Sequence, residues 1–116
     1  CHQRGFEFHA WVNPFRAISS VTFSSIHPDH ITKKEPEWFF KYGDRVYFNP
    51  GIPEVRTYLV KVALEIVRKY DIDGLHFDDY FYPYKINGEH INDDDTFDKF
   101  GKEFTNIEDW RRNNID

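Results

Sequence analysis

The sequence predicts an α/β fold built on a parallel sheet, and two observations support this. Strand patterns at 5–13 and 72–79 are separated by a long helix with one apolar face, which is the element order of a βα repeat. Polar residues also gather near the carboxyl end of each predicted strand, on the side facing away from that helix. Helices cover both faces of a central strand in a doubly wound sheet, whereas polar groups line the inner face of a barrel at that end. We therefore expect part of a (β/α)8 TIM barrel.

The chain is too short for a complete barrel. It has 116 residues, no methionine and a single cysteine, Cys1, whereas such barrels need ~250 residues. We expect one partial domain over 1–116, with about two parallel strands, amphipathic helices and long βα loops, that continues beyond both ends in a longer protein. Cys1 to Gly5 resembles the tail of a helix and its turn more than a lipid-anchored terminus. We expect the isolated piece to be inactive and to fold poorly alone, because an open barrel sheet exposes its strand edges.

Composition narrows the possible partners. The formal net charge is −5 and no basic block is present, which argues against nucleic acid. The most apolar stretch, 59–67, is interrupted by charges and is far shorter than the ~18 residues of a membrane span. Nucleotide-binding glycine motifs are absent, so we expect no cofactor. Aromatic residues make up 19 % of the chain and are suited to a shared core or to binding flat sugar faces.

The first predicted strand, 5–13, alternates with a period of two. One face carries Phe6, Phe8, Ala10 and Val12. The other carries Glu7, His9, Trp11 and Asn13. We expect 14–53 to be mostly irregular, with a short helical turn at 35–41 and an extended segment at 45–48, a length of irregular chain that is unusual unless it is functional.

The best-determined element is a helix over 53–70. Pro53 suits its first position, and its apolar residues recur with helical spacing, which predicts a stripe packed on a sheet. In the second strand, Leu75 and Phe77 face the helix while His76 and Asp78 face inward. Short amphipathic helices are expected at 96–104 and 106–113.

Asp78 is the strongest candidate for catalysis because it is an inward carboxylate at the end of a strand. Its neighbour Asp79 has the opposite parity and belongs to the loop or supports the site. Glycoside hydrolysis usually needs two carboxyl groups. The candidates for the second are Glu7, Glu89, the run 93–95, or a residue outside the chain; the acidic run is more typical of a solvated surface or of calcium ligands.

Several other residues are candidates for binding substrate. Arg16 follows the first strand and could pair with Asp78, hold an anionic substrate group or be a surface arginine. We expect Phe81 to pack under its loop, and His27 and His30 to be surface residues. Rings near the strand ends could stack on sugars or pack the loop: Trp11, Tyr80, Tyr82 and Tyr84.

Two alternatives remain open from the residues alone. One is a metal-dependent hydrolase with His9, His76 and Asp78 as ligands, although no close ligand pair such as HExxH supports it. The other is a carbohydrate-binding piece without catalysis, in which the aromatic residues bind the glycan.

Three segments carry a resemblance to a known family. They are His9-Ala-Trp-Val-Asn-Pro-Phe-Arg-Ala, Asn49-Pro-Gly-Ile-Pro-Glu-Val-Arg and Tyr70-Asp-Ile-Asp-Gly-Leu-His-Phe-Asp-Asp-Tyr-Phe-Tyr-Pro. Together they resemble the glycosyl hydrolase-like 10 family, in family order and over nearly the whole chain. The resemblance implies part of a TIM-barrel glycoside hydrolase, usually bacterial and exported to the periplasm or cell envelope, often a lipoprotein, and linked to cell-wall glycan.

The segment 73–78 is also similar to the fourth-strand motif of α-amylase-like barrels, whose final aspartate is the nucleophile. That similarity implies the same role for Asp78. The amylase arginine two positions earlier is His76 here, so the mechanism need not carry over. We expect Asp78 to be nucleophile or base, with no bound metal and no cofactor. Substrate-binding or supporting roles are expected for His9, Trp11, Asn13, Arg16, His76, Asp79, Tyr80 and Tyr82.

Overall fold

A computed structural model describes residues 1–18, 27–78 and 81–116 and has mixed α/β architecture. In this part of the chain no helix is long and apolar enough to span a membrane. The helices are η1 (His2–Arg4), α1 (Ile31–Lys34), η3 (Pro36–Trp38), α2 (Pro53–Lys69), α3 (Asp94–Phe100) and α4 (Ile107–Asn113). The strands are β1 (His9–Val12), β2 (Arg16–Ile18), β3 (Phe39–Tyr42), β4 (Arg45–Phe48) and β5 (Gly74–Phe77).

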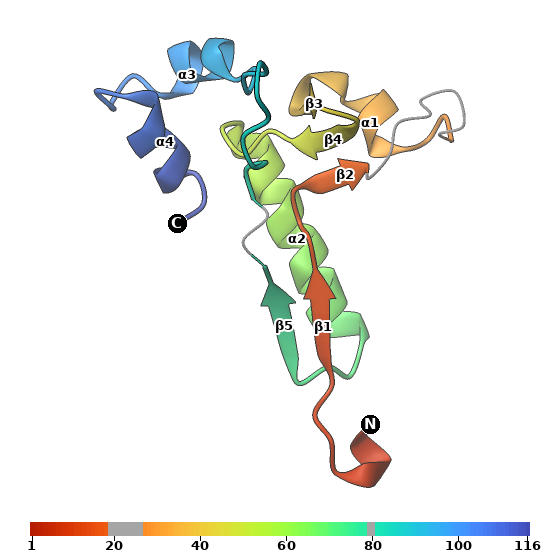
Figure 1. Cartoon of the computed structure of the whole chain (residues 1–116). Coiled ribbons are helices and arrows are strands. Elements are labelled where there is room, and N and C mark those ends of the chain that lie inside the picture. Colours follow the sequence, from red (N-terminus) through yellow and green to blue (C-terminus); the bar gives the residue numbers. More distant parts are fainter. Residues whose placement is uncertain (19–26, 79–80) are drawn as a thin grey trace.

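The predicted parallel pair is present. β1 pairs with β5 in a register that sets His9 opposite Gly74 and Trp11 opposite His76. Figure 1 shows β1 and β5 side by side with α2 along them. The strands β2, β3 and β4, together with α3 and α4, lie near the ends to which β1 and β5 point. This arrangement is compatible with part of a TIM barrel, and it puts the long connections at the carboxyl end of the strands.

α2 forms where its periodicity predicts. It begins at Pro53 without a side-chain cap, and Glu65 pairs with Lys69 one turn later on the exposed side. Its apolar stripe faces the strands, since Leu59 and Ile66 line a pocket together with Leu75. Val12 of β1 and Phe77 of β5 line the same pocket, so the predicted helix-facing sides of both strands are confirmed.

The segment expected to be mostly irregular instead contains an antiparallel sheet of order β2-β4-β3. Gly43, at φ 63°, closes the tight turn between β3 and β4, which pair from Phe39 opposite Phe48 to Tyr42 opposite Arg45. The helical turn predicted at 35–41 is wrong at its end: η3 stops at Trp38 and the chain continues as β3. The extended segment 45–48 and the first part of the helical turn, where η3 forms, were predicted correctly.

The C-terminal helices dock through a buried contact network. The ring of Trp110 lies where a side chain on Gly51 would be, so a Cβ built there would be 2.4 Å from Trp110 Cη2. Asp93 has no exposed surface and forms a two-pronged ion pair with Arg111, with Nε to Oδ2 at 2.8 Å and Nη2 to Oδ1 at 2.5 Å. The expectation that the whole run 93–95 is solvated or binds calcium is therefore wrong for Asp93, because a cation on α4 balances its charge.

At the amino end of β1 and β5, His2 and the backbone N–H of Phe8 both contact Asp73, an arrangement that we call the N-terminal clasp. η1 ends at Arg4 and is capped by Gly5 at φ 75°, which agrees with the helical tail and turn expected there. Asp73 Oδ2 accepts from Phe8 N–H at 2.7 Å and lies 2.6 Å from His2 Nε2. The hydrogen bond and the charge of Asp73 raise the pKa of His2 above its ordinary 6.5, while the Phe8 N–H and His2 lower the pKa of Asp73 below 3.8.

Candidate active site

Asn13 and Asp78 lie at the matching ends of two parallel strands. β1 ends at Val12 and β5 at Phe77, which are register partners, so each strand is followed by one polar residue at the same height. Both side chains share the inward parity of Trp11 and His76. The structure thus brings Asn13 and Asp78 together, as the strand pattern predicts.

The amide of Asn13 bridges Asp78 and Arg16. The oxygen and nitrogen of an amide are assigned from their hydrogen-bonding neighbours. With the nitrogen toward Asp78, it donates to Oδ1 at 2.5 Å and Oδ2 at 2.6 Å, and the amide oxygen accepts from Arg16 Nη2 at 3.0 Å. The opposite orientation would set the amide oxygen against the carboxylate and the amide nitrogen against the guanidinium. Arg16 therefore reaches Asp78 through Asn13.

An aromatic pair lies directly below this bridge on the same face. The rings of Trp11 and His76 meet edge to face, with centroids 5.8 Å apart. Trp11 is 70 % exposed, which leaves much of its indole open beside the polar cluster. The indole therefore presents an exposed, flat apolar face beside a carboxylate.

His9 lies deeper on the inner face, against Gly74. A Cβ at Gly74 would be 2.4 Å from His9 Nδ1, so a larger residue there would displace the imidazole from this position. Its Nε2 is 3.1 Å from Glu7 Oε2. The Glu7–His9 pair was not predicted, although a glycine within a strand pattern is a signal of such a close approach.

The other residues predicted to lie at the site do not contribute to this cluster in the described part of the chain. Asp79 and Tyr80 fall outside the described residues. Tyr82 packs on α4, where its hydroxyl accepts from Asn114 Nδ2 at 3.3 Å and its ring centroid lies 5.8 Å from the Arg111 guanidinium. Burial there raises the pKa of Tyr82 to about 12. Phe81 packs edge to face on Phe15, as expected.

The carboxylates proposed as a partner for Asp78 have other contacts. Glu89 Oε2 accepts from Gly43 N–H at 2.8 Å, Asp93 is paired with Arg111, and Glu7 lies beside His9. Asp94 and Asp95 are exposed in the first turn of α3. Among the described residues no three His, Cys, Asp or Glu side chains come together to hold a metal ion, so His9, His76 and Asp78 do not form the ligand set considered above.

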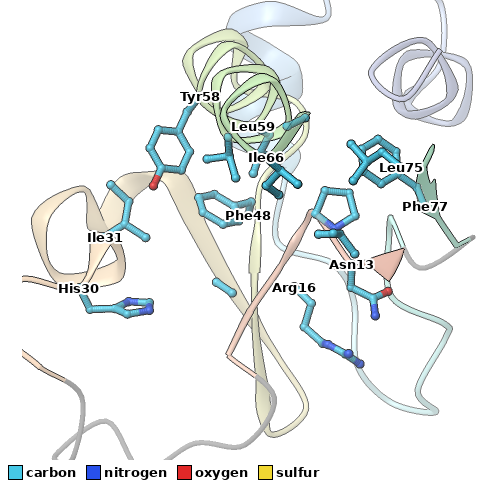
Figure 2. Close-up of a pocket in the computed structure, with 15 residues that line it drawn as sticks. Asn13, Arg16, His30, Ile31, Phe48, Tyr58, Leu59, Ile66, Leu75 and Phe77 are labelled. Carbon is cyan, nitrogen blue, oxygen red and sulfur yellow. The ribbon is translucent and has the colours of Figure 1, made fainter. Parts of the chain in front are cut away.

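A pocket of about 230 Å³ lies between α2 and the strands, on the helix side (Figure 2). Its wall is apolar, with Asn13, Arg16 and His30 as its polar members. His30 is not the plain surface residue expected: it is half-buried, and its Nδ1 accepts from Thr32 N–H as the N-cap of α1. The apolar lining suits packing, so we place the candidate site at Asp78, whose partner Asn13 lines this pocket together with Arg16.

Comparison with known proteins identifies the family. The model of the glycosyl hydrolase-like 10 family matches residues 1–116. The chain belongs to this family. Among relatives of this glycosyl hydrolase-like 10 chain, the glycosyl hydrolase YngK of Bacillus subtilis (strain 168) is 47 % identical over 116 residues, which are 98 % of this chain and 23 % of YngK.

A second relative is the glycosyl hydrolase DigH of Escherichia coli (strain K12). It is 37 % identical over 122 aligned positions, which cover 97 % of this chain and 28 % of DigH. The glycosyl hydrolase-like 10 chain thus spans about a quarter of the length of these two relatives. Both relatives are named glycosyl hydrolases, and the family is described as glycosyl hydrolase-like.

Proposed function

We propose that this chain contributes the catalytic carboxylate Asp78 to a glycoside hydrolase active site in a longer protein. The observation that carries the proposal is the position of Asp78: it follows a parallel strand, accepts from Asn13 at the end of the neighbouring strand and lies one inward step from the open indole of Trp11. At that point a carboxylate can attack the anomeric carbon or activate water, and the indole can carry the sugar ring.

The longer protein completes the site. Since the carboxylates of this chain that were candidates for the second role have other contacts or lie on α3, the proposal assigns that role to a residue outside it. Among the described residues β1 and β5 pair only with each other, and Val60, Leu64 and Val67 of α2 are exposed. Both features fit a barrel whose other strands and helices cover these surfaces. The proposed substrate is a polysaccharide, with bacterial cell-wall glycan as the first candidate, and the proposed location is the periplasm or cell envelope.

The test is Asp78→Asn in the full-length protein, which keeps the side-chain volume and removes the charge. With bacterial cell-wall glycan as substrate and new reducing ends as the readout, we expect kcat to fall by about 10³-fold or more, equivalent to ~4 kcal/mol of transition-state stabilisation. Asp98→Asn, on the exposed surface of α3, is the matched control and should keep full activity. Unchanged cleavage by Asp78→Asn would exclude the assignment. Binding of glycan without cleavage by the wild type would favour a carbohydrate-binding role.

A further inference from the structure

Arg16 is anchored independently of the parallel strands. Its backbone pairs with Tyr47 in the antiparallel sheet, and the preceding residue, Phe15, is buried and accepts through its carbonyl from Phe48 N–H at 2.7 Å. Pro14 separates this anchor from Asn13. The guanidinium therefore reaches back from a fixed sheet toward the end of β1.

The bridge from Arg16 to Asp78 has a definite polarity. Arg16 has only donors and the Asp78 carboxylate only acceptors, and the Asn13 amide between them offers an acceptor to the first and a donor to the second. The positive charge of Arg16 beside the amide oxygen polarises the amide. This polarisation strengthens the hydrogen bonds that the amide nitrogen donates to the carboxylate. The two hydrogen bonds to Oδ1 and Oδ2 fix the direction in which the carboxylate faces.

We propose that Arg16 is a positioning residue that acts on Asp78 through Asn13, and that it does not bind the substrate. This inference rests on the proposed function, because it assigns Arg16 a part in orienting the proposed nucleophile or base. Arg16 orients the Asn13 amide, and the amide orients the Asp78 carboxylate. Pairing in the antiparallel sheet fixes the backbone of Arg16. The alternative expected from sequence, an anionic substrate group bound by Arg16, makes a different kinetic prediction.

A double-mutant cycle in the full-length protein separates the two roles. The variants are Asn13→Ala, Arg16→Met, which keeps the aliphatic stem, and the double variant, assayed for kcat and KM on the same glycan. We expect Asn13→Ala to lower kcat about 10²-fold through misplacement of the carboxylate. We expect Arg16→Met to lower it about tenfold, the worth of one charge-assisted hydrogen bond. KM should change by less than ~3-fold in both.

The decisive result is the double variant. If Arg16 acts through Asn13, the double variant is no slower than Asn13→Ala alone. Arg16→Lys, which still offers a donor to the amide oxygen, should recover most of the lost kcat. Arg112→Met, an exposed arginine paired with Asp109, is the control and should change neither constant. Because Arg16→Lys keeps charge and stem, it also tests the idea if Arg16→Met folds poorly.

Two outcomes would overturn the inference. Losses that multiply in the double variant, or a loss that falls on KM, would show that Arg16 contacts the substrate directly. Asp78→Asn, run in the same assay, separates the two levels of the proposal. If Asp78→Asn stays active, the proposed function fails. If Asp78 is essential but the losses multiply, only the role of Arg16 fails.

Discussion

Replacing Asp93 by asparagine tests the ion pair that joins α3 to α4. Asp93 is fully buried and binds Arg111 through two hydrogen bonds, so the variant places an NH₂ group against a guanidinium that has only donors. Breaking a buried pair typically costs about 3–5 kcal/mol. Arg111 keeps 26 % of its side-chain surface exposed and can recover some hydration, and asparagine leaves no cavity, so we expect about 2–3 kcal/mol.

Hydrogen exchange measures this cost locally, even in a long protein. A loss of about 2–3 kcal/mol in opening free energy should speed exchange of the α4 amides about 30- to 150-fold, at 1.4 kcal/mol per factor of ten. Asp94→Asn is the control from the same acidic run: Asp94 is exposed, and its interaction with the helix dipole of α3 is worth less than about 1 kcal/mol. Equal exchange rates in the two variants would refute the claim that the buried pair stabilises this region.

Two further predictions concern a packing contact and the N-terminal clasp. Gly51→Ala should destabilise the protein by about 1–3 kcal/mol, lowering its denaturation midpoint, because the new Cβ would overlap Trp110. Adding Trp110→Phe should recover part of that loss, and no recovery would exclude the contact as the cause. The His2–Asp73 bond should be complete between about pH 4 and 6.5: it weakens as pH rises through the raised pKa of His2 or falls through the lowered pKa of Asp73. Exchange of the Phe8 amide, corrected for intrinsic rates, should therefore be slower at pH 6 than at pH 8, and His2→Gln should remove this difference.

Local periodicity was enough to predict the parts of the fold that depend on local patterns. The apolar stripe of α2 and the alternation in β1 and β5 appear with the predicted faces. The meeting of Asn13 with Asp78 follows from the same alternation, because parallel strands in register end at the same height. What alternation could not supply was the orientation of the Asn13 amide, which depends on a third residue, Arg16.

The errors arose where a pairing partner outside the local pattern decides the outcome. Residues 35–41 fit a helical turn locally, but residues 39–42 pair with β4 and so become a strand. Asp93 lies in a run of three aspartates that suggests solvent, yet Arg111, far along the chain, lets it be buried. The segment 35–41 by itself does not include β4, and the run 93–95 does not include Arg111, so in both places pairing with another segment overrides the local preference.

The missed sheet bears directly on the site. β2 leaves the end of β1 and pairs with β4, and this pairing holds the backbone of Arg16 beside the Asn13 amide. In an irregular loop, Arg16 would have to lose backbone conformational entropy in order to contact the Asn13 amide. That loss would weaken the hydrogen bond between them. Because it is carried by a sheet, the bridge is already formed before substrate arrives. The insertion after the first strand therefore belongs to the proposed catalytic arrangement, and changes to its pairing, such as at Tyr47, should reach Asp78 through Arg16 and Asn13.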